Sequence, residues 1–454
     1  MMKTNPNNGL TYSQEQLKEI AQTVLQHARA CGASDAAVEV SEGSGLSVDV
    51  RKGKTETIER NQDKTVGVSV FIGQRRGNAS TSDLSLPALR ATVEAAYDIA
   101  RFTAEDSCAG LAEQDVLEMD PPNLELFHYW DLNVNDAEAL ALRAEQAAFA
   151  VSPLITNSDG ANVSVQHAHF VLATTKGFMA GYPYSRHTIS CSPIAGKGSH
   201  MQTGYWYASK RAPQALALPE EIGSYAAQRA LSRLHPRSVT TQQCAVLFEA
   251  PLAAGLLGAF VQAVSGGALY RKSSFLLDTL GQAIFPEHIS ITETPHQLGA
   301  IGSAPFDDEG VRTKSRDVVR NGILQGYFLS TYSAKKLGMV TTGNAGGSHH
   351  LQLTSRLTHK DDSLPAMLKK MGTGLLVTDL MGQGVNYVTG DYSRGASGYW
   401  IEQGNIAYPV EGITIAGNLK QMFQQIVAVG ADNFIRGAKD IGSVLIEKMT
   451  VAGH

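Results

Sequence analysis

Residues 247–255 read Leu247-Phe248-Glu249-Ala250-Pro251-Leu252-Ala253-Ala254-Gly255. The run before Glu249 is short and hydrophobic, as in a buried strand, and the residues after it are apolar and rich in Ala and Gly, as in a buried helix. The stretch therefore predicts a strand that passes directly into a helix. A single carboxylate, Glu249, stands at the junction.

Signals for β-hairpins surround this junction from residue 240 onwards. Asn321-Gly322 and Gln403-Gly404-Asn405 each separate two runs of strand-forming residues. The Asn-Gly dipeptide favours the type I′ turn, whose twist matches that of the flanking strands. One more helix is expected at 419–429. The pattern predicts a β-rich C-terminal domain of antiparallel hairpins over residues 239–454.

Two α/β segments precede this domain, so the predicted fold class is α+β. We expect an N-terminal α+β domain at 1–110 and a middle α+β domain at 111–238, with a polar linker at 103–124. An amphipathic helix is expected at 13–31, where Ser13 and Gln16 form a capping box. The other expected elements are strands at 46–50, 55–60, 66–72, 163–165, 170–175, 188–192 and 204–209, and helices at 87–100, 136–150 and 219–234.

Composition describes an ordinary globular chain of two or three domains. Of its 454 residues 43% are hydrophobic and 18% charged, and the net charge is −5. The absence of a basic stripe argues against nucleic-acid binding. There is no apolar run long enough to span a membrane and no secretory signal at the N-terminus. Four widely spaced cysteines indicate reduced, buried thiols and a cytoplasmic protein: Cys31, Cys108, Cys191 and Cys244.

Several C-terminal motifs resemble the TldD/PmbA family, also called the modulator-of-DNA-gyrase or TldD/TldE peptidases. They are Asp307-Asp308-Glu309-Gly310-Val311, Asn321-Gly322-Ile323-Leu324-Gln325-Gly326-Tyr327, Thr389-Gly390-Asp391-Tyr392-Ser393-Arg394-Gly395-Ala396-Ser397-Gly398, and Tyr408-Pro409-Val410 followed by Ile413-Thr414-Ile415-Ala416-Gly417-Asn418-Leu419. The N-terminal match, around 67–83, is looser. The 391–398 run is similar to the PmbA (TldE) branch.

The resemblance gives the strand–helix junction a chemical meaning. In the metal-bearing branch this position reads His-Glu-x-x-x-His, and a cysteine near the C-terminus supplies a third ligand. Here the two histidine positions are Phe248 and Ala253, and no cysteine follows Cys244. Neither a phenyl ring nor a methyl group can bind a metal. We therefore predict no metal and no catalytic residue on this chain. Glu249 is expected to be structural, although a general base remains open.

The resemblance also implies partners and a substrate class. It implies a cytosolic heterodimer with a TldD-type subunit that carries zinc or iron, and homodimerisation of the isolated chain remains open. The complex would trim unfolded peptides, such as leader segments of modified peptides and small antitoxins. Water bound to the partner's metal would attack the scissile carbonyl, with the partner's Glu as base. This chain would shape the substrate channel and stabilise the partner.

Asp391, Tyr392, Ser393 and Arg394 are the candidate substrate-binding residues. They crowd one segment bounded by glycines, which we interpret as a loop. Such a loop could offer an arginine and main-chain N–H groups to a peptide carboxylate or carbonyl. The alternative is a structural turn with an internal Arg–Asp pair.

Other residues support different functions. His167 and His169 are two apart on an expected strand and would share a face, so an autonomous metallopeptidase with an atypical site stays open, although no carboxylate accompanies them locally. His349-His350 is interpreted as a loop or surface pair. Asp307-Asp308-Glu309-Gly310 resembles half of a calcium loop but is more simply an acidic turn. A third hypothesis, from the older family name, is a non-enzymatic protein that modulates DNA gyrase.

Overall fold

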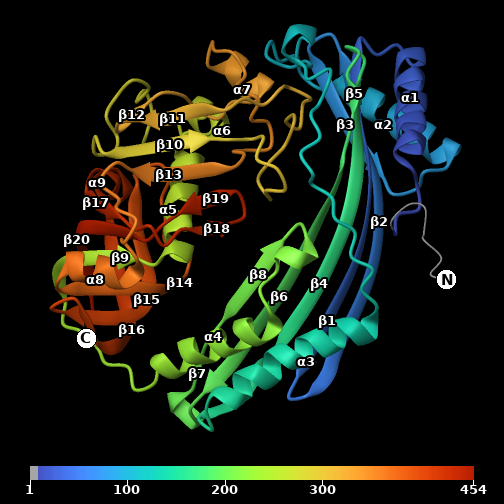
Figure 1. The fold of residues 1–454 in the computed structure, drawn as a ribbon. Helices are drawn as coiled ribbons and strands as arrows, with labels where there is room; N and C mark the ends of the chain where they lie inside the picture. The colour runs from blue at the N-terminus through green and yellow to red at the C-terminus, as the bar shows by residue number, and fades with distance from the viewer. Residues whose placement is uncertain (1–8, 454) are drawn as a thin grey trace. The chain divides into compact units, whose positions relative to one another are not determined.

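The computed structural model describes residues 9–453, and it confirms an α+β fold with a β-rich C-terminal part (Figure 1). The chain forms two compact units. Unit 1 contains residues up to 231 together with 298–313, and unit 2 contains 232–297 together with residues from 314 onwards. In the described part of the chain, no helix combines the length and apolar character needed to cross a membrane.

Unit 1 is built on an antiparallel sheet in the order β3-β2-β1-β4-β6-β7, with β5 beside β4 and β8 beside β6. The strands are β1 (Asp35–Arg51), β2 (Lys54–Ile72), β3 (Arg75–Thr81), β4 (Ile155–Thr174), β5 (Met179–Ala180), β6 (Pro183–Ala195), β7 (Gln202–Thr203) and β8 (Trp206–Lys210). The helices are α1 (Gln14–Ala30), α2 (Leu86–Phe102), α3 (Val134–Val151) and α4 (Pro219–Ser232), with short 3-10 helices η1 (Gln114–Val116), η2 (Gly198–His200) and η3 (Pro213–Ala215).

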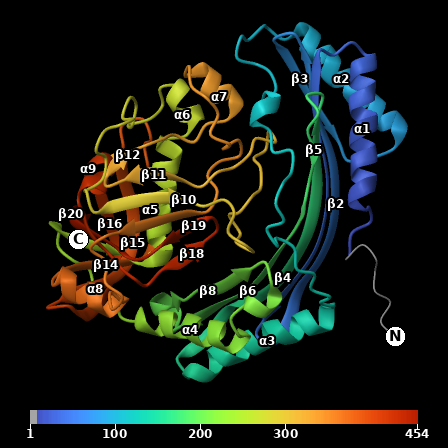
Figure 2. The same cartoon turned by 45° about the horizontal axis from the view of Figure 1, so that its top comes forward.

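One face of this sheet is covered by helices. Figure 2 shows α1 and α2 lying over it. Alternate residues of β1 and β2, such as Val38, Val40 and Val68, form a hydrophobic cluster with these two helices. The predicted cap of the first helix is confirmed, because Ser13 and Gln16 make both bonds of a capping box. The opposite face of the sheet is free of these two helices.

The predicted short strands at 46–50, 55–60 and 66–72 were wrong in their lengths. They belong to two continuous strands, β1 and β2, of 17 and 19 residues. Polar residues on β2 are exposed, but they do not interrupt the main-chain pairing, which runs from Arg51 and Lys54 to Asp35 and Phe71. The predicted linker at 103–124 is also packed, because Leu117 is fully buried among residues of unit 1.

Unit 2 contains two sheets, ordered β12-β11-β10-β13-β19-β18 and β16-β15-β14-β9-β20-β17. The strands are β9 (Gln242–Phe248), β10 (Ile289–Glu293), β11 (Arg316–Arg320), β12 (Ile323–Leu324), β13 (Leu351–Ser355), β14 (Gly374–Met381), β15 (Asp391–Glu402), β16 (Asn405–Asn418), β17 (Ile426–Val429), β18 (Phe434–Arg436), β19 (Lys439–Ile441) and β20 (Val444–Ala452). The helices are α5 (Ala250–Ala263), α6 (Gly266–Tyr270), α7 (Thr331–Lys336), α8 (Leu364–Met371) and α9 (Leu419–Gln424).

Both predicted hairpins of unit 2 are present. Asn321 and Gly322 adopt φ values of 49° and 78°, and Gln403 and Gly404 adopt 50° and 76°, as a type I′ turn requires. The helix predicted at 419–429 was too long, because Ile426–Val429 pairs with β20 instead. The predicted domain boundaries at 110 and 238 stay predictions. Strands β1 and β4, from different predicted domains, are hydrogen-bonded neighbours.

Candidate functional site

The strand–helix junction predicted at 247–255 lies in the core of unit 2. Strand β9 ends at Phe248, Glu249 is the N-cap of helix α5, and Pro251 falls in its first turn. Phe248 and Ala253, at the two histidine positions of the motif, are fully buried in one hydrophobic cluster that contains residues of both sheets. Their side chains carry no atom that can bind a metal, so the donor set does not fit a zinc or iron site.

Glu249 holds the junction together through its main chain. Its N–H donates to the Val377 carbonyl at 3.1 Å, and its carbonyl accepts from the N–H groups of Leu252 and Ala253 at 2.8 and 2.9 Å. The side chain makes no capping hydrogen bond and is 6% exposed. A carboxylate at a helix N-terminus is favoured by the helix dipole. The main-chain contacts of Glu249 fix the strand–helix junction, and the structural role of its side chain stays a prediction.

A cavity of about 120 Å³ lies beside helix α5, and it brings two of the predicted binding residues to this helix. One face of α5 lines it, together with residues of strands β14 and β15 and of the segment between them. The lining residues are Leu252, Gly255, Leu256, Ala259, Leu380, Gln383, Val385, Tyr387, Tyr392 and Arg394. We call this cavity the α5 pocket. It is large enough for one side chain or main-chain group of a peptide.

The predicted loop at 391–394 is the beginning of strand β15, which explains why its four residues separate. Asp391 to Ala396 pair with Asn418 to Ile413 of β16, and side chains alternate along such a strand. Tyr392 and Arg394 therefore share the face that lines the α5 pocket, whereas Asp391 and Ser393 are exposed.

The alternative of an internal Arg–Asp pair is not observed. The Asp391 carboxylate instead accepts from the Thr389 hydroxyl at 2.7 Å and from Asn418 Nδ2 at 3.2 Å. These two hydrogen bonds lower the pKa of Asp391, the Thr389 bond most. Asp391 thus fixes the turn that leads into β15, and Arg394 is left without a carboxylate from this segment.

Tyr392 and Arg394 form the polar wall of the α5 pocket. Tyr392 is 4% exposed, and its burial raises its pKa to about 12, which Arg394 partly opposes through its charge and a hydrogen bond. The Nε atom of Arg394 is buried and has no hydrogen-bond partner in the part of the chain that the structure describes. Buried donors in native proteins are normally paired, and Arg394 Nε could therefore donate to a group that enters the pocket.

His167 and His169 do share one face of β4, as predicted, but both use their ring nitrogens within unit 1. His167 Nε2 accepts from the Trp130 N–H at 3.1 Å, and His169 lies 3.1 Å from Gln14 Oε1 and 3.3 Å from Glu42 Oε2. No carboxylate lies near them in the sequence, but pairing of β1 with β4 places Glu42 opposite His169.

Glu42 is itself held by main-chain donors rather than by a metal. Burial alone would raise the pKa of Glu42, but hydrogen bonds from Tyr12 and Thr11 outweigh this effect and lower it. Within residues 9–453, no group of three or more His, Cys, Asp or Glu side chains is arranged to hold a metal ion. The geometry of the histidine pair is therefore that of a buried hydrogen-bond network.

This network predicts a pH dependence of stability. Burial, and secondly the charge of His187, lowers the pKa of His167 from 6.5 to about 4. Between pH 6.5 and about pH 4, His167 binds a proton in the unfolded chain but not in the folded chain. The free energy of unfolding should therefore fall by about 3 kcal/mol as the pH drops from 7 to 4. Urea unfolding of the wild-type protein and of His167→Gln at pH 7 and 4.5 should show a weaker pH dependence in the variant. His200→Gln, at an exposed position of the same unit, is the control and should leave the dependence unchanged.

Neither of the other two candidates belongs to a group of three or more His, Cys, Asp or Glu side chains arranged to hold a metal within residues 9–453. His349-His350 lies in a loop, one of the two settings expected for the pair, and the two side chains are only 9% and 1% exposed. His349 Nε2 lies 2.8 Å from the Gly343 carbonyl, and its main-chain N–H donates to the buried Glu293. The acidic turn at 307–310 is confirmed as a turn, since Asp307 accepts from the N–H groups of Glu309 and Val311.

Comparison with known families accounts for almost the whole chain. Models of the PmbA/TldA metallopeptidases match residues 36–100 as domain 1, 127–234 as the central domain and 241–453 as the C-terminal domain. The chain belongs to the PmbA/TldA metallopeptidase family. The family resemblance inferred from the motifs is thus confirmed, and the junction at Glu249 lies in the family's C-terminal domain.

Sequence identity to family members from other organisms shows which branch of the family the chain resembles. It is 46% identical to the metalloprotease PmbA homologue of Haemophilus influenzae over the full length of both proteins. It is 28% identical to the metalloprotease TldD homologue of the same organism, over 35% of this chain and 34% of that protein. The chain is therefore a PmbA-type member of the family.

Two crystal structures share its fold. A proposed modulator of DNA gyrase from Bacteroides thetaiotaomicron matches with a TM-score of 0.91 and 26% identity, over 97% of this chain and 99% of that one. TldE from Thermococcus kodakarensis matches with a TM-score of 0.83 and 19% identity, over 96% and 100%. The second similarity concerns the fold alone.

One pocket of this PmbA/TldA family member was not predicted from the sequence. It lies on the helix-free face of the unit 1 sheet, and its charged residues include Glu39 and Arg76. Arg76 lies in the looser N-terminal match around residues 67–83, whereas Glu39 lies in no motif. Only the register of β1, β2 and β3 brings them to the same surface, so no local pattern in the sequence could have indicated them.

Proposed function

We propose that the protein is the PmbA/TldE-type subunit of a two-chain metallopeptidase. In this proposal a TldD-type chain carries the metal, and this chain helps to hold an unfolded peptide. The observation that carries the proposal is that unit 2 lacks metal ligands at the motif positions but has a pocket with an unpaired polar donor beside them. Phe248 and Ala253 fill the core where metal ligands would stand, yet the adjacent α5 pocket keeps a buried, unpaired donor at Arg394 Nε.

The guanidinium of Arg394 can bind a peptide because its Nε atom has no hydrogen-bond partner among the described residues of this chain. An arginine donor that is already desolvated forms a strong, charge-assisted bond to a carboxylate, and a polarised one to a carbonyl. The apolar α5 residues around it, such as Leu252 and Leu256, would receive a neighbouring apolar side chain. An unfolded leader segment or a small antitoxin would present such groups in an extended form.

The proposed partner and location rest on separate observations. Haemophilus influenzae has a TldD homologue beside its PmbA homologue, which supports a pair of related chains as the working unit. The cysteines Cys31, Cys108, Cys191 and Cys244 are unpaired thiols, as is typical of the cytoplasm. Size-exclusion chromatography with light scattering should detect a heterodimer with a TldD-type chain. A mixture that elutes only as the separate chains would contradict the pairing.

Metal content is the first prediction from this assignment. The purified chain should contain no stoichiometric zinc or iron, because the motif positions Phe248 and Ala253 offer no ligand atoms. Elemental analysis after gel filtration measures this directly. A TldD-type chain prepared in the same way is the control and should retain roughly one metal ion. One tightly held metal per chain in this protein would instead support an autonomous metallopeptidase.

A further inference from the structure

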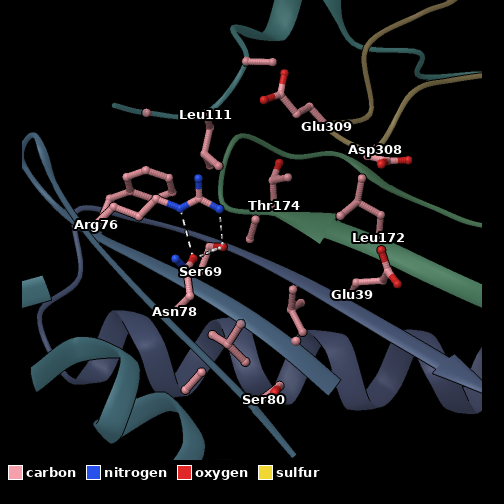
Figure 3. A pocket seen from close by; sticks show the side chains of 18 of the residues that line it. Glu39, Ser69, Arg76, Asn78, Ser80, Leu111, Leu172, Thr174, Asp308 and Glu309 are labelled. Carbon is pink, nitrogen blue, oxygen red and sulfur yellow. Dashed lines mark hydrogen bonds between the residues drawn. The ribbon is translucent and has the colours of Figure 1, made fainter. Parts of the chain in front are cut away.

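The helix-free face of the unit 1 sheet contains a second pocket, of about 500 Å³ (Figure 3). Its floor is formed by β1, β2, β3 and β4, and its walls by residues 110–112 and 308–309. We call it the sheet pocket. Its size falls within the range of ligand-binding pockets. Gly67 of β2 lies in the floor, where a Cβ atom would have no protein atom within 4 Å.

One end of the sheet pocket is positively charged. Arg76 of β3 donates from Nε to Asn78 Oδ1 at 3.0 Å and from Nη2 to Ser69 Oγ at 3.1 Å, and its guanidinium lies 5.8 Å from the centre of the Phe71 ring. These contacts are with uncharged groups, so they orient the guanidinium but do not neutralise its positive charge. Among the described residues, Arg76 makes no ion pair, so an anion at this end would have no competitor.

The other end is negatively charged. Figure 3 shows Glu39, Asp308 and Glu309 across the pocket from Arg76. Partial burial, and secondly the charge of Asp308, raises the pKa of Glu39. A carboxylate whose pKa is raised by a neighbouring carboxylate is stabilised by a cation placed between the two. This end therefore favours an ammonium or another cationic group.

Between the two ends lies a polar group without a partner. Thr174, the last residue of β4, is 6% exposed, and its Oγ1 atom has no hydrogen-bond partner within the described residues. Figure 3 shows its side chain in the pocket, between Arg76 and the acidic end. A buried hydroxyl without a partner costs stability unless a ligand or water satisfies it. Thr174 therefore points to a ligand with a polar group in its middle.

The register of the sheet sets the length of that ligand. Arg76 pairs with Phe71, and Glu39 pairs with Gly67, so the two residues are two strands and four positions apart. Their Cα atoms are then roughly 17 Å from each other, a gap that two long side chains shorten. Three extended residues span roughly 10 Å, whereas a free amino acid is too short to reach both ends.

We propose that the sheet pocket binds a short peptide of about three residues by its two charged ends. The peptide's ammonium group lies at Glu39 and Asp308, its carboxylate at Arg76, and the Thr174 hydroxyl bonds to its main chain. The apolar side chains of Leu111 and Leu172 line the space for its central residue. The inference goes beyond the proposed function, because it concerns unit 1 alone and requires no partner chain and no cleavage.

The test is isothermal titration of the full-length chain, without a partner, at neutral pH and low salt. The probes are alanyl-leucyl-alanine, its N-acetylated form, its C-terminal amide and free alanine. The unmodified tripeptide should bind, each blocked form should bind about ten- to hundredfold more weakly, and alanine should not bind. No binding of the unmodified tripeptide, or equal binding of the acetylated form, would overturn the proposal.

Variants then locate the site. Arg76→Gln, Glu39→Gln and Thr174→Val should each weaken binding about tenfold or more, since each removes one polar contact. Gly67→Val should block the pocket without altering any of these groups. Arg75→Gln is the matched control, because Arg75 pairs with Glu105 outside the pocket and should leave the affinity unchanged. Melting temperatures confirm that the variants are folded, and wild-type affinity in folded Gly67→Val would contradict the assignment.

Discussion

Mixed with a TldD-type chain, the protein is expected to cleave unfolded peptides that it does not cleave alone. The reason is the donor set at the junction, where Phe248 and Ala253 cannot hold the metal that activates water. A fluorogenic assay on an unfolded peptide should show no turnover above background with this chain alone. Addition of the partner should raise the rate by at least about a hundredfold, and a chelator should abolish it.

Two controls separate this result from contamination and from simple stabilisation of the partner. The TldD-type chain is assayed alone and with a heat-unfolded sample of this chain, neither of which should reach the rate of the mixture. A folded chain that cleaves the peptide without any partner, in a chelator-sensitive manner, would contradict the proposal. It would also favour the autonomous metallopeptidase.

Replacement of Arg394 by alanine is expected to lower peptide turnover by the mixed complex about ten- to hundredfold. This range corresponds to the loss of one charge-assisted hydrogen bond, of roughly 1.5–3 kcal/mol. The buried Nε of Arg394 has no partner in the described structure, so the substitution removes no Nε hydrogen bond within the chain. Among the described residues, the substitution removes only the hydrogen bond to Tyr392, so the melting temperature of the isolated chain should fall slightly while the rate falls strongly.

Ser393→Ala and Arg394→Lys complete this experiment. Ser393 is exposed, does not line the α5 pocket, and should be neutral when replaced. Lysine keeps the charge of Arg394 but loses its planar fork, so a Lys variant as slow as the Ala variant would indicate a directional contact. If Arg394→Ala lowers the melting temperature or prevents assembly, with normal turnover per intact complex, the residue is structural.

Local signals in the sequence predicted much of the fold because they act over a few residues. The capping box at Ser13 and the turns at Asn321-Gly322 and Gln403-Gly404 are dictated by the chain itself and are present. Strand lengths and the end of the last helix were not predictable in this way. The exposed polar residues of β2 are held in a strand by pairing with β1, and Ile426–Val429 is held in a strand by β20.

Features of the candidate site also could be predicted only where they depend on residues that are close in the sequence. The junction at Glu249 could be predicted because its strand and helix are contiguous in the chain. The meeting of Arg394 with α5 depends on the alternation of β15, which the loop interpretation of 391–394 did not provide. The carboxylate beside His169 comes from pairing of β1 with β4, and the charged residues of the sheet pocket come from β1, β3 and the turn at 307–310. No short motif encodes such contacts.

The most direct measurement compares two glutamate substitutions in the same mixed complex. One complex carries Glu249→Gln in this chain, and the other carries Glu→Gln at the corresponding motif position of the TldD-type chain. Peptide turnover should stay within about twofold of wild type in the first and fall by at least about a hundredfold in the second, because only the partner holds the catalytic metal. A loss of about a hundredfold or more from Glu249→Gln, in a complex that remains assembled, would contradict the account.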